Sequence, residues 1–542
     1  MSKLGGVRPG RSEERRESGG EGKRGGLCYR MNLAVTGAAA WTMSDKPQAF
    51  VLLFTVVYAA LFVFLSIYKH EIYASSRFDL GNMDQAVWNS ARGNILAATD
   101  ETGEITSRLR NHTDFLLLAF VPLYWIVESP YWLLIVQAVT VAAGAIPLYW
   151  LCRRFLAGYA WPAALISVAY LFNPGLHGAN LFDFHSQMMA GTLLLFAFHY
   201  MLEKRLWPFL AFAVLAATTK EEIVLLVAMM GLYAIWPLKR PKWGVPIFTL
   251  GTAYFLLVML VIIPSFNVGG TSNLVGDRYE AFGGSMGGLL VTVLTDPLFI
   301  LGYVLSGPRL DYLLQLASLG GGLPLLSPLV LAIPLPEIAI NVISQRPQMV
   351  SLRYHYSAPV LPFVYLATAA GLYTATRLML RLRQWGRFPG RWTRRFLSRR
   401  LLVVRAPLLI SLVILLSTAQ ASYNTGPLPW FHAPDSQSSV VDPPPERHLA
   451  ALNEAVAMIP DDASVSASNR IGPHLAHRDY LYLFPLVRDA DYVVLDERYP
   501  GYDTFIEPVV SVQSVRNLRE SADYELVYEV DGVLVFERGE GE

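Results

Sequence analysis

The chain has 542 residues, of which 53% are hydrophobic and only 16% are charged. Soluble globular proteins carry about 25% charged residues, so this composition excludes a soluble protein and indicates an integral membrane protein. The formal net charge of +1 gives no reason to expect nucleic acid as a partner. The two cysteines, Cys28 and Cys152, lie far apart and predict neither a disulfide framework nor a CxxC metal site.

The N-terminal residues 1–45 are rich in Gly, Arg, Glu and Ser, which is typical of a disordered tail. This segment does not have the pattern of a signal peptide, because its basic stretch meets no apolar core until about residue 50. We therefore expect a disordered cytoplasmic tail in front of a membrane domain that covers residues 46–421.

Apolar segments follow one another through that domain. A transmembrane helix needs about 20 mostly apolar residues, and residues 50–68 (FVLLFTVVYAALFVFLSIY) satisfy this requirement. Further candidate spans are residues 131–151, 158–173, 187–202, 206–218, 222–237, 244–264, 310–326, 327–343, 356–376 and 402–420. The pattern predicts an all-α polytopic bundle of about eleven transmembrane helices. Repeated Pro and Gly residues interrupt the two candidates between residues 310 and 343.

Basic residues set the expected orientation. Lys and Arg cluster after every second span, at Arg153–Arg154, Lys204–Arg205 and residues 239–242, and ten arginines lie between Arg377 and Arg405. Short cytoplasmic loops are enriched in such residues. A multi-pass protein of the cell membrane with a cytoplasmic N-terminus and an external C-terminus follows. In this arrangement residues 113–127 are an interfacial helix at the outer surface rather than a span, and residues 288–305 are expected to lie in the same way.

The C-terminal part has the composition of a soluble domain. Residues 422–445 are rich in Pro, Ser and Asp and are predicted to be a linker. Residues 446–542 are predicted to form a small external α/β domain, with a helix over 446–458, strands over 463–468 and 491–497, and a hairpin over 524–538 that turns at Asp531-Gly532.

The first external loop holds the first group of candidate site residues. Asp79 and Asp84 lie five residues apart, so on a helix they point to different sides. His112 and Asp114 follow in the same loop. Asp79 also suits the N-cap of a helix over residues 80–91, and this role is compatible with a functional one.

The second external loop contains Asp183 and His185. An Asp-x-His pair suits a divalent metal, or it forms a hydrogen-bonded pair that orients a hydroxyl group. Two ligands do not make a metal site, and plain polar packing is favoured over metal binding.

Charged residues also interrupt two later apolar regions. Lys220 and Glu221 separate two short apolar segments, either as a solvated pair in a tight turn or as a cation aimed at a phosphate. Glu337 lies within a predicted span, where a carboxylate is a candidate functional group or the buried partner of another polar group. Arg353 and His355 precede a span on the outer side and are candidates for binding an anionic headgroup or a diphosphate.

The strings FDLGNMDQAVWN, GAIPLYWLCRR, FDFH, TKEE and RYHYSAPVLPF resemble the bacterial membrane family called domain of unknown function 2079, over roughly residues 50–535. Its layout is similar to the GT-C superfamily of lipid-linked glycosyltransferases, which includes protein mannosyltransferases and the aminoarabinose transferase of lipid A. The resemblance implies a large external loop after the first span that opens with a catalytic acid, and Asp79 occupies that position. The second, adjacent acid of the GT-C pattern is absent, because Leu80 follows Asp79.

The resemblance predicts transfer of a sugar from a polyprenyl-phosphate donor to an acceptor at the outer membrane face. Asp79 would act as the base for the acceptor hydroxyl, and Arg353 or Lys220 would stabilise the anionic leaving group. We expect Asp79 and at least two of His112, Asp183, His185 and Lys220 to line a common pocket, within about 10 Å of one another. A transporter or lipid flippase and a non-catalytic membrane scaffold are the alternative functions.

Overall fold

The computed structural model describes residues 46–267, 278–284, 286–384, 405–428, 443–499 and 508–539. The tail expected over residues 1–45 and most of the linker expected over 422–445 lie outside these ranges. Residues Val51–Glu542 form one compact unit, and every contact discussed below lies within it.

Five helical segments in the described residues are long and apolar enough to cross a membrane. They are α2 (Lys46–Glu71), the consecutive α5 (Tyr131–Ala143) and α6 (Ala145–Phe155), the run of α12 (Pro241–Leu257), η4 (Val258–Ile262) and α13 (Ile263–Phe266), α20 (Leu361–Gln384) and α22 (Ala406–Thr425). At 1.5 Å per residue, 20 or more residues extend about 30 Å, which matches the hydrocarbon core of a bilayer. The chain is therefore a multi-pass membrane protein.

Other predicted spans are shorter in the structure. The apolar helices α7 (Ala160–Leu171), α9 (Gln187–Leu202), α10 (Leu206–Ala217) and α11 (Ile223–Ile235) fall below the usual spanning length. Residues 288–305, expected to lie at the interface, belong largely to α15 (Met286–Thr295) and α16 (Pro297–Val304), a pair bent by 101°, and their position in the membrane stays a prediction. The count of about eleven spans is therefore not confirmed, because sequence hydropathy does not show where an apolar helix ends.

Proline and glycine divide the region between residues 307 and 343, as their positions in the sequence indicate. It consists of α17 (Gly307–Ser318), η6 (Leu323–Leu326), α18 (Pro328–Leu331) and α19 (Leu335–Ile343). Residues 113–127 contain only η3 (Phe115–Phe120) and α4 (Val121–Tyr124). These ten residues are too short to span a bilayer, which is compatible with the interfacial position expected for them.

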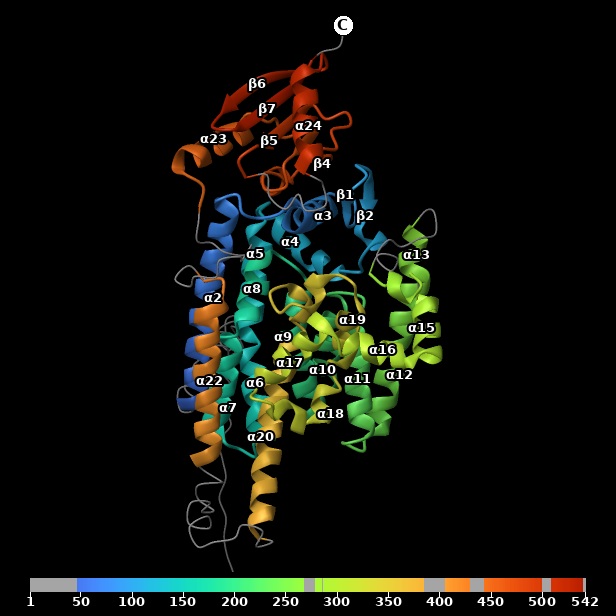
Figure 1. Cartoon of the computed structure of the whole chain (residues 1–542), viewed down its shortest axis with the longest axis vertical. Coiled ribbons are helices and arrows are strands. Elements are labelled where there is room, and N and C mark those ends of the chain that lie inside the picture. The colour runs from blue at the N-terminus through green and yellow to red at the C-terminus, as the bar shows by residue number, and fades with distance from the viewer. Residues whose placement is uncertain are drawn as a thin grey trace, which may run out of the picture. The chain divides into compact units, whose positions relative to one another are not determined.

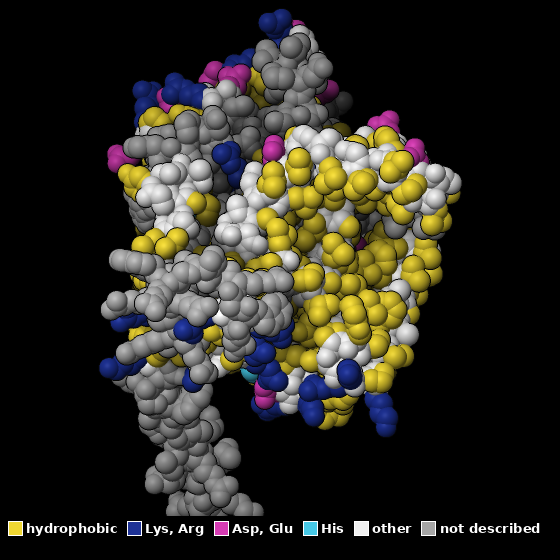
Figure 2. Space-filling view, turned by 60° about the horizontal axis from the view of Figure 1, so that its bottom comes forward, with side chains coloured by type: hydrophobic (Ala, Val, Ile, Leu, Met, Phe, Trp, Pro, Cys, Tyr) yellow, Lys and Arg dark blue, Asp and Glu magenta, His cyan; other side chains and the backbone are white. Residues whose placement is uncertain are grey.

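The helical region presents apolar side chains on its surface. Figure 2 shows a broad hydrophobic face with Lys and Arg side chains gathered along its lower edge. Large exposed apolar residues include Leu250 and Leu260 in the α12–α13 run and Leu294 and Leu298 in the bent pair. In water such a face would be costly, whereas lipid chains cover it at no cost.

Residues 72–130 connect α2 to α5. They contain η1 (Arg77–Gly81), α3 (Asn82–Ala91) and a hairpin of β1 (Ala97–Thr99) and β2 (Ile105–Ser107), followed by η2 (Arg108–Arg110). Further along the chain, α8 (Pro174–Phe182) precedes the Asp183–His185 segment (Figure 1).

The C-terminal region contains a five-stranded sheet in the order β4-β3-β5-β7-β6. Its elements are α23 (Glu446–Ala457), β3 (Val465–Ala467), η10 (Gly472–Leu475), β4 (Leu481–Leu483), β5 (Tyr492–Asp496), α24 (Pro508–Glu520), β6 (Tyr524–Val530) and β7 (Val533–Arg538). β3 pairs in parallel with β4 and β5, and β7 pairs antiparallel with β5 and β6.

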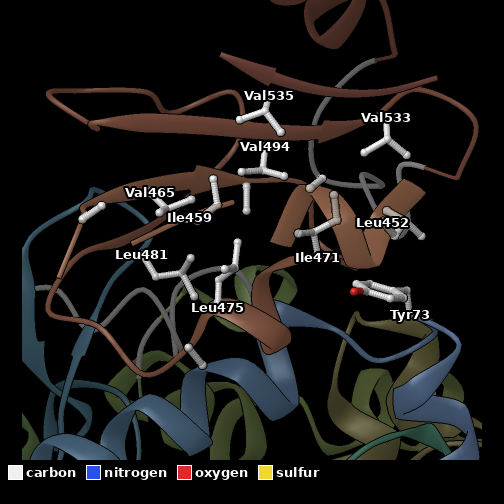
Figure 3. Close-up of a cluster of buried hydrophobic side chains, with 14 of the residues drawn as sticks. Tyr73, Leu452, Ile459, Val465, Ile471, Leu475, Leu481, Val494, Val533 and Val535 are labelled. Carbon is white, nitrogen blue, oxygen red and sulfur yellow. The ribbon is translucent and has the colours of Figure 1, made fainter. Parts of the chain in front are cut away.

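The predicted helix, strands and final hairpin of this region are all present. The hairpin turns at Asp531 and Gly532, whose φ angles of 53° and 85° suit a two-residue turn. One face of the sheet packs on α23 through a cluster that includes Leu452, Val494 and Val535 (Figure 3). Tyr73, which follows α2, belongs to the same cluster. The boundaries of a separate domain over residues 446–542 stay a prediction.

Candidate functional site

Asp79 lies in η1, a single π-helical turn between Ser76 and α3. Single π turns occur frequently at functional sites. The side chain of Ser76 caps this turn by accepting a hydrogen bond from Phe78 N, and α3 begins only at Asn82. The alternative role of Asp79 as the N-cap of a helix over 80–91 is therefore wrong, and its carboxylate is available for other partners.

The carboxylate of Asp79 contacts His185. Oδ1 of Asp79 lies 3.1 Å from Nε2 of His185. The Asp79 side chain is 21% exposed, whereas that of His185 is 7% exposed. The His185 ring stacks on His355, with a centroid distance of 3.7 Å and an interplanar angle of 16°. Three predicted site residues from three separate segments therefore meet at one place.

Asp183 is buried beside the same turn. Its Oδ1 atom lies 3.0 Å from Nζ of Lys69, and its Oδ2 atom accepts a hydrogen bond from Ser76 N at 2.8 Å. Burial raises the pKa of Asp183 to about 6, although Lys69 acts in the opposite direction. Asp183 thus links the end of α2, the start of η1 and the end of α8.

These contacts do not fit the metal site considered for Asp183 and His185. Both carboxylate oxygens of Asp183 already have donors, and Nε2 of His185 faces Asp79. Among the described residues, no group of three or more His, Cys, Asp and Glu side chains is placed to hold a metal ion. The other interpretation of the Asp-x-His pair, a hydrogen-bonded orienting role, agrees with the geometry.

The turn between α10 and α11 is buried, so the solvated-pair interpretation of Lys220 and Glu221 is wrong. Nδ1 of His112 lies 2.8 Å from Oε1 of Glu221, and Thr113 N donates to Oε2. Lys220 pairs with Glu222 at 2.6 Å. Burial alone would raise the pKa of Glu221, but His112 and Lys220 outweigh it and hold that pKa well below its usual range.

Lys220 is also connected, through Gln187, to Glu337, the carboxylate that the sequence predicts within a span. Its Nζ atom donates to Oε1 of Gln187 at 3.2 Å, and Gln187 Nε2 donates to Oε1 of Glu337 at 2.7 Å. Glu337 is 1% exposed, and its Oε2 atom has no partner among the described residues. Glu337 is therefore a buried hydrogen-bonded residue that retains one unpaired oxygen.

His355 lies close enough to these groups for their charges to affect its pKa. Burial lowers its pKa well below the usual value, and the nearby His185, Lys220, Arg278 and His112 lower it further. The imidazole of His355 is therefore neutral at pH 7. Its Nδ1 atom and that of His185 are both buried and have no hydrogen-bond partner in the described part of the chain.

Two predicted residues of the first loop form contacts of their own. Asp84 is 1% exposed and accepts hydrogen bonds from Tyr124 and from Nε2 of His477. Asp114 pairs with Arg108 at 2.6 Å. The five-residue spacing predicts that Asp79 and Asp84 point to different sides of a helix. Their different partners, His185 and His477, agree with this prediction.

Arg353 is exposed, and its backbone packs closely against Gly178 of α8. Within the described residues, no ion pair engages its guanidinium group. The structure thus brings Asp79, Asp183, His185 and His355 together. Lys220 and His112 interact electrostatically with His355, whereas Arg353 lies at the surface. That these residues line one ligand-binding pocket stays a prediction.

The sequence interpretation missed several residues of this network. Lys69 lies in the last turn of α2, where an ionisable group near membrane depth was a signal for function. Gln187, at the start of α9, and Arg278 carried no comparable signal, because neither belongs to a recognisable motif. His477 lies in the C-terminal region, where no site residue was predicted, and its partner is the carboxylate of Asp84.

Comparisons with known proteins agree with this architecture. A family model described as "Predicted membrane protein (DUF2079)" matches residues 69–535. No curated protein matches the chain. The crystal structure of ArnT from Cupriavidus metallidurans bound to undecaprenyl phosphate superposes with a TM-score of 0.50 and 13% sequence identity, covering 90% of this chain and 98% of that chain.

The apo structure of the same ArnT gives a TM-score of 0.45 and 11% identity, covering 90% of this chain and 97% of that chain. At these identities the similarity to the lipid-bound structure shows a shared fold. The match over residues 69–535 shows that the chain belongs to the DUF2079 family of predicted membrane proteins, and its fold is similar to that of lipid-bound ArnT.

Proposed function

We propose that this protein is a GT-C-type membrane glycosyltransferase that transfers a sugar from a polyprenyl-phosphate donor to an acceptor hydroxyl at the outer membrane face. The observation that carries the proposal is the hydrogen bond between Asp79 and His185 on a π-helical turn. This bond involves a partly exposed carboxylate, in the residue that the GT-C resemblance assigns as the catalytic acid, and so supports that role. The similarity to lipid-bound ArnT supports a lipid-linked donor.

In the proposed reaction Asp79 is the general base. Its carboxylate takes the proton of the acceptor hydroxyl as the acceptor oxygen forms a bond to the anomeric carbon of the sugar. The bond between that carbon and the phosphate oxygen breaks, and the polyprenyl phosphate leaves with the bonding electrons. His185, held by its stack on His355, keeps the Asp79 carboxylate in one orientation.

The leaving phosphate needs a cation beside it. Lys220 is already engaged by Glu222 and Gln187, so it serves this role less readily than the sequence suggested. Arg353 lies two residues before His355, is exposed, and has no ion pair within the described residues. We therefore assign binding of the phosphate to Arg353. Lys220 contributes positive charge to the site, and its Nζ atom lies over the ring of Tyr356 at 5.5 Å from the centroid.

The proposal is tested by sugar transfer in reconstituted membranes. Purified protein in liposomes is supplied with radiolabelled polyprenyl-phosphate pentose, hexose and N-acetylhexosamine, and with a membrane extract as acceptor. Asp79→Asn keeps the size of the side chain but removes the base, so kcat should fall by about 10²- to 10⁴-fold. Glu101→Gln, which removes an exposed carboxylate from the same loop, is the matched control and should transfer normally.

Equal rates for wild type and Asp79→Asn would disprove the assignment of the base. If the wild-type protein transferred none of these sugars but moved the labelled lipid across the bilayer, the flippase alternative would replace the enzyme.

A further inference from the structure

A segment near the C-terminus contacts the turn that carries Asp79. We call residues 469–480, which lie between β3 and β4, the clasp. Oδ1 of Asn469 accepts hydrogen bonds from Ser76 Oγ at 3.1 Å and from Phe78 N at 3.2 Å. The backbone carbonyl of Asn469 accepts a further bond from Arg77 N at 2.8 Å. Asn469 is 2% exposed, so water does not compete freely for these donors.

The backbones of the clasp and the turn approach each other closely at two glycines. A Cβ atom on Gly81 would lie 3.3 Å from Cα of Pro473. A Cβ atom on Gly472 would lie 2.5 Å from the Arg77 side chain, a distance that real Cβ contacts do not show. The turn and the clasp are thus closely packed, with Gly81 against the backbone of Pro473 and Gly472 against the Arg77 side chain.

Arg77 reinforces this contact from inside the turn. Its guanidinium group is 2% exposed and donates to the carbonyl of Thr99 at 2.6 Å and to that of Leu481 at 2.8 Å. Burial lowers the pKa of Arg77 to about 10, which leaves the group charged at pH 7. A buried cation with fixed carbonyl partners has few alternative positions. Arg77 therefore holds η1, β1 and the start of β4 at fixed positions relative to one another.

The first N–H groups of any helical turn lack acceptors within the turn itself. Asn469 supplies acceptors for two of them, at Arg77 and Phe78, which lie directly before Asp79. A π-helical turn has poorer internal hydrogen bonding than an α-helix and depends more strongly on such outside partners.

We propose that Asn469 is a positioning residue for Asp79, and that the C-terminal region is therefore part of the catalytic apparatus. The inference rests on the proposed role of Asp79 as the base. None of the site residues predicted from the sequence lies within residues 446–542. Here the amide of Asn469 fixes the turn, and the turn fixes the direction of the carboxylate.

The test compares two substitutions of Asn469 in the full-length protein. Asn469→Leu removes the side-chain acceptor for Ser76 and Phe78, whereas Asn469→Asp keeps an oxygen at the same place. Asn469→Leu should lower kcat by about tenfold while the donor KM stays within about twofold, because the two side-chain hydrogen bonds no longer hold the turn that carries the base. Asn469→Asp should restore most of the lost rate.

A second readout does not depend on activity. Backbone hydrogen exchange, followed by mass spectrometry of peptides that cover residues 76–82, should become faster in Asn469→Leu and stay near the wild-type rate in Asn469→Asp. The control is Ser466→Ala in the neighbouring β3. Ser466 is buried and donates to the carbonyl of Leu486, away from the turn. This control should change neither kcat nor exchange over residues 76–82.

Unchanged kcat in Asn469→Leu would overturn the proposal, whether or not exchange of the turn increases. If Asn469→Leu does not fold, Asn469→Ser decides, since its hydroxyl is too short to reach both donors and the same results are expected. Should the wild-type protein transfer no sugar at all, the proposed function fails. The exchange measurement still shows whether Asn469 holds the turn.

Discussion

Glu221 shows how a buried charge in this protein depends on its partners. Its carboxylate lies against His112 and Thr113 N, and these partners together with Lys220 overcome the effect of burial and keep its pKa well below the usual value. A carboxyl group whose pKa is depressed by folding adds stability above its unfolded pKa, and that stability is lost as the pH falls.

We therefore expect the wild-type protein to lose thermal stability between about pH 5 and about pH 3, because the unfolded pKa of Glu is about 4.3. The Glu221→Gln variant should be less stable at neutral pH and should lose less on acidification, with a difference of a few degrees in the unfolding temperature. The measurement is thermal unfolding in detergent at several pH values. Parallel curves for the two proteins would contradict the pairing of Glu221 with His112.

At the scale of elements, α11 and α12 pack through glycines. A Cβ atom on Gly244 would lie 2.4 Å from the carbonyl oxygen of Gly231, and one on Gly231 would lie 2.6 Å from Phe248 N. Small residues at such positions let membrane helices approach closely. Side chains at Gly231 or Gly244 would force these two helices apart.

Gly244→Ala should therefore lower the free energy of unfolding by about 1–3 kcal/mol. The matched control is Gly302→Ala in α16, where an added Cβ atom has no neighbour within 4 Å. This change should be neutral or raise stability by up to about 1 kcal/mol, because alanine favours a helix over glycine. Chemical or thermal unfolding of both variants in the same detergent provides the comparison, and equal effects would exclude close packing at Gly244.

At the scale of the whole molecule, the distribution of basic residues predicts how the chain lies in the membrane. From the clusters at Arg153–Arg154, Lys204–Arg205 and residues 239–242 we expect these loops to lie in the cytoplasm and the Asp79 loop to lie outside. We expect an alkaline phosphatase fused to the C-terminus to be active and a green fluorescent protein at the same place to be dark. Fusions after Arg205 should give the opposite result. A fluorescent C-terminal fusion would place Asp79 in the cytoplasm and exclude an external reaction.

The sequence by itself determined the features that depend on local physics. Long apolar runs predict helices such as α2 and α22, because a bilayer requires about 20 apolar residues wherever they occur. The Asp531-Gly532 turn could be predicted from the sequence, because a two-residue turn that requires positive φ at both positions favours Asp and Gly there. Asp79 was singled out from the GT-C resemblance, and Asp183 and His185 from their short spacing.

Only the tertiary structure decided which side chains meet. Asp79 pairs with His185, Lys69 with Asp183, and Asn469 with the turn at Ser76, and each pair joins residues that are more than 100 positions apart. Such partners are selected by the packing of helices and by the cost of leaving buried polar groups unpaired, which depends on the whole fold rather than on neighbouring residues. The same packing decided that helices such as α10 and α11 end short of a full span, with the buried Lys220 turn between them.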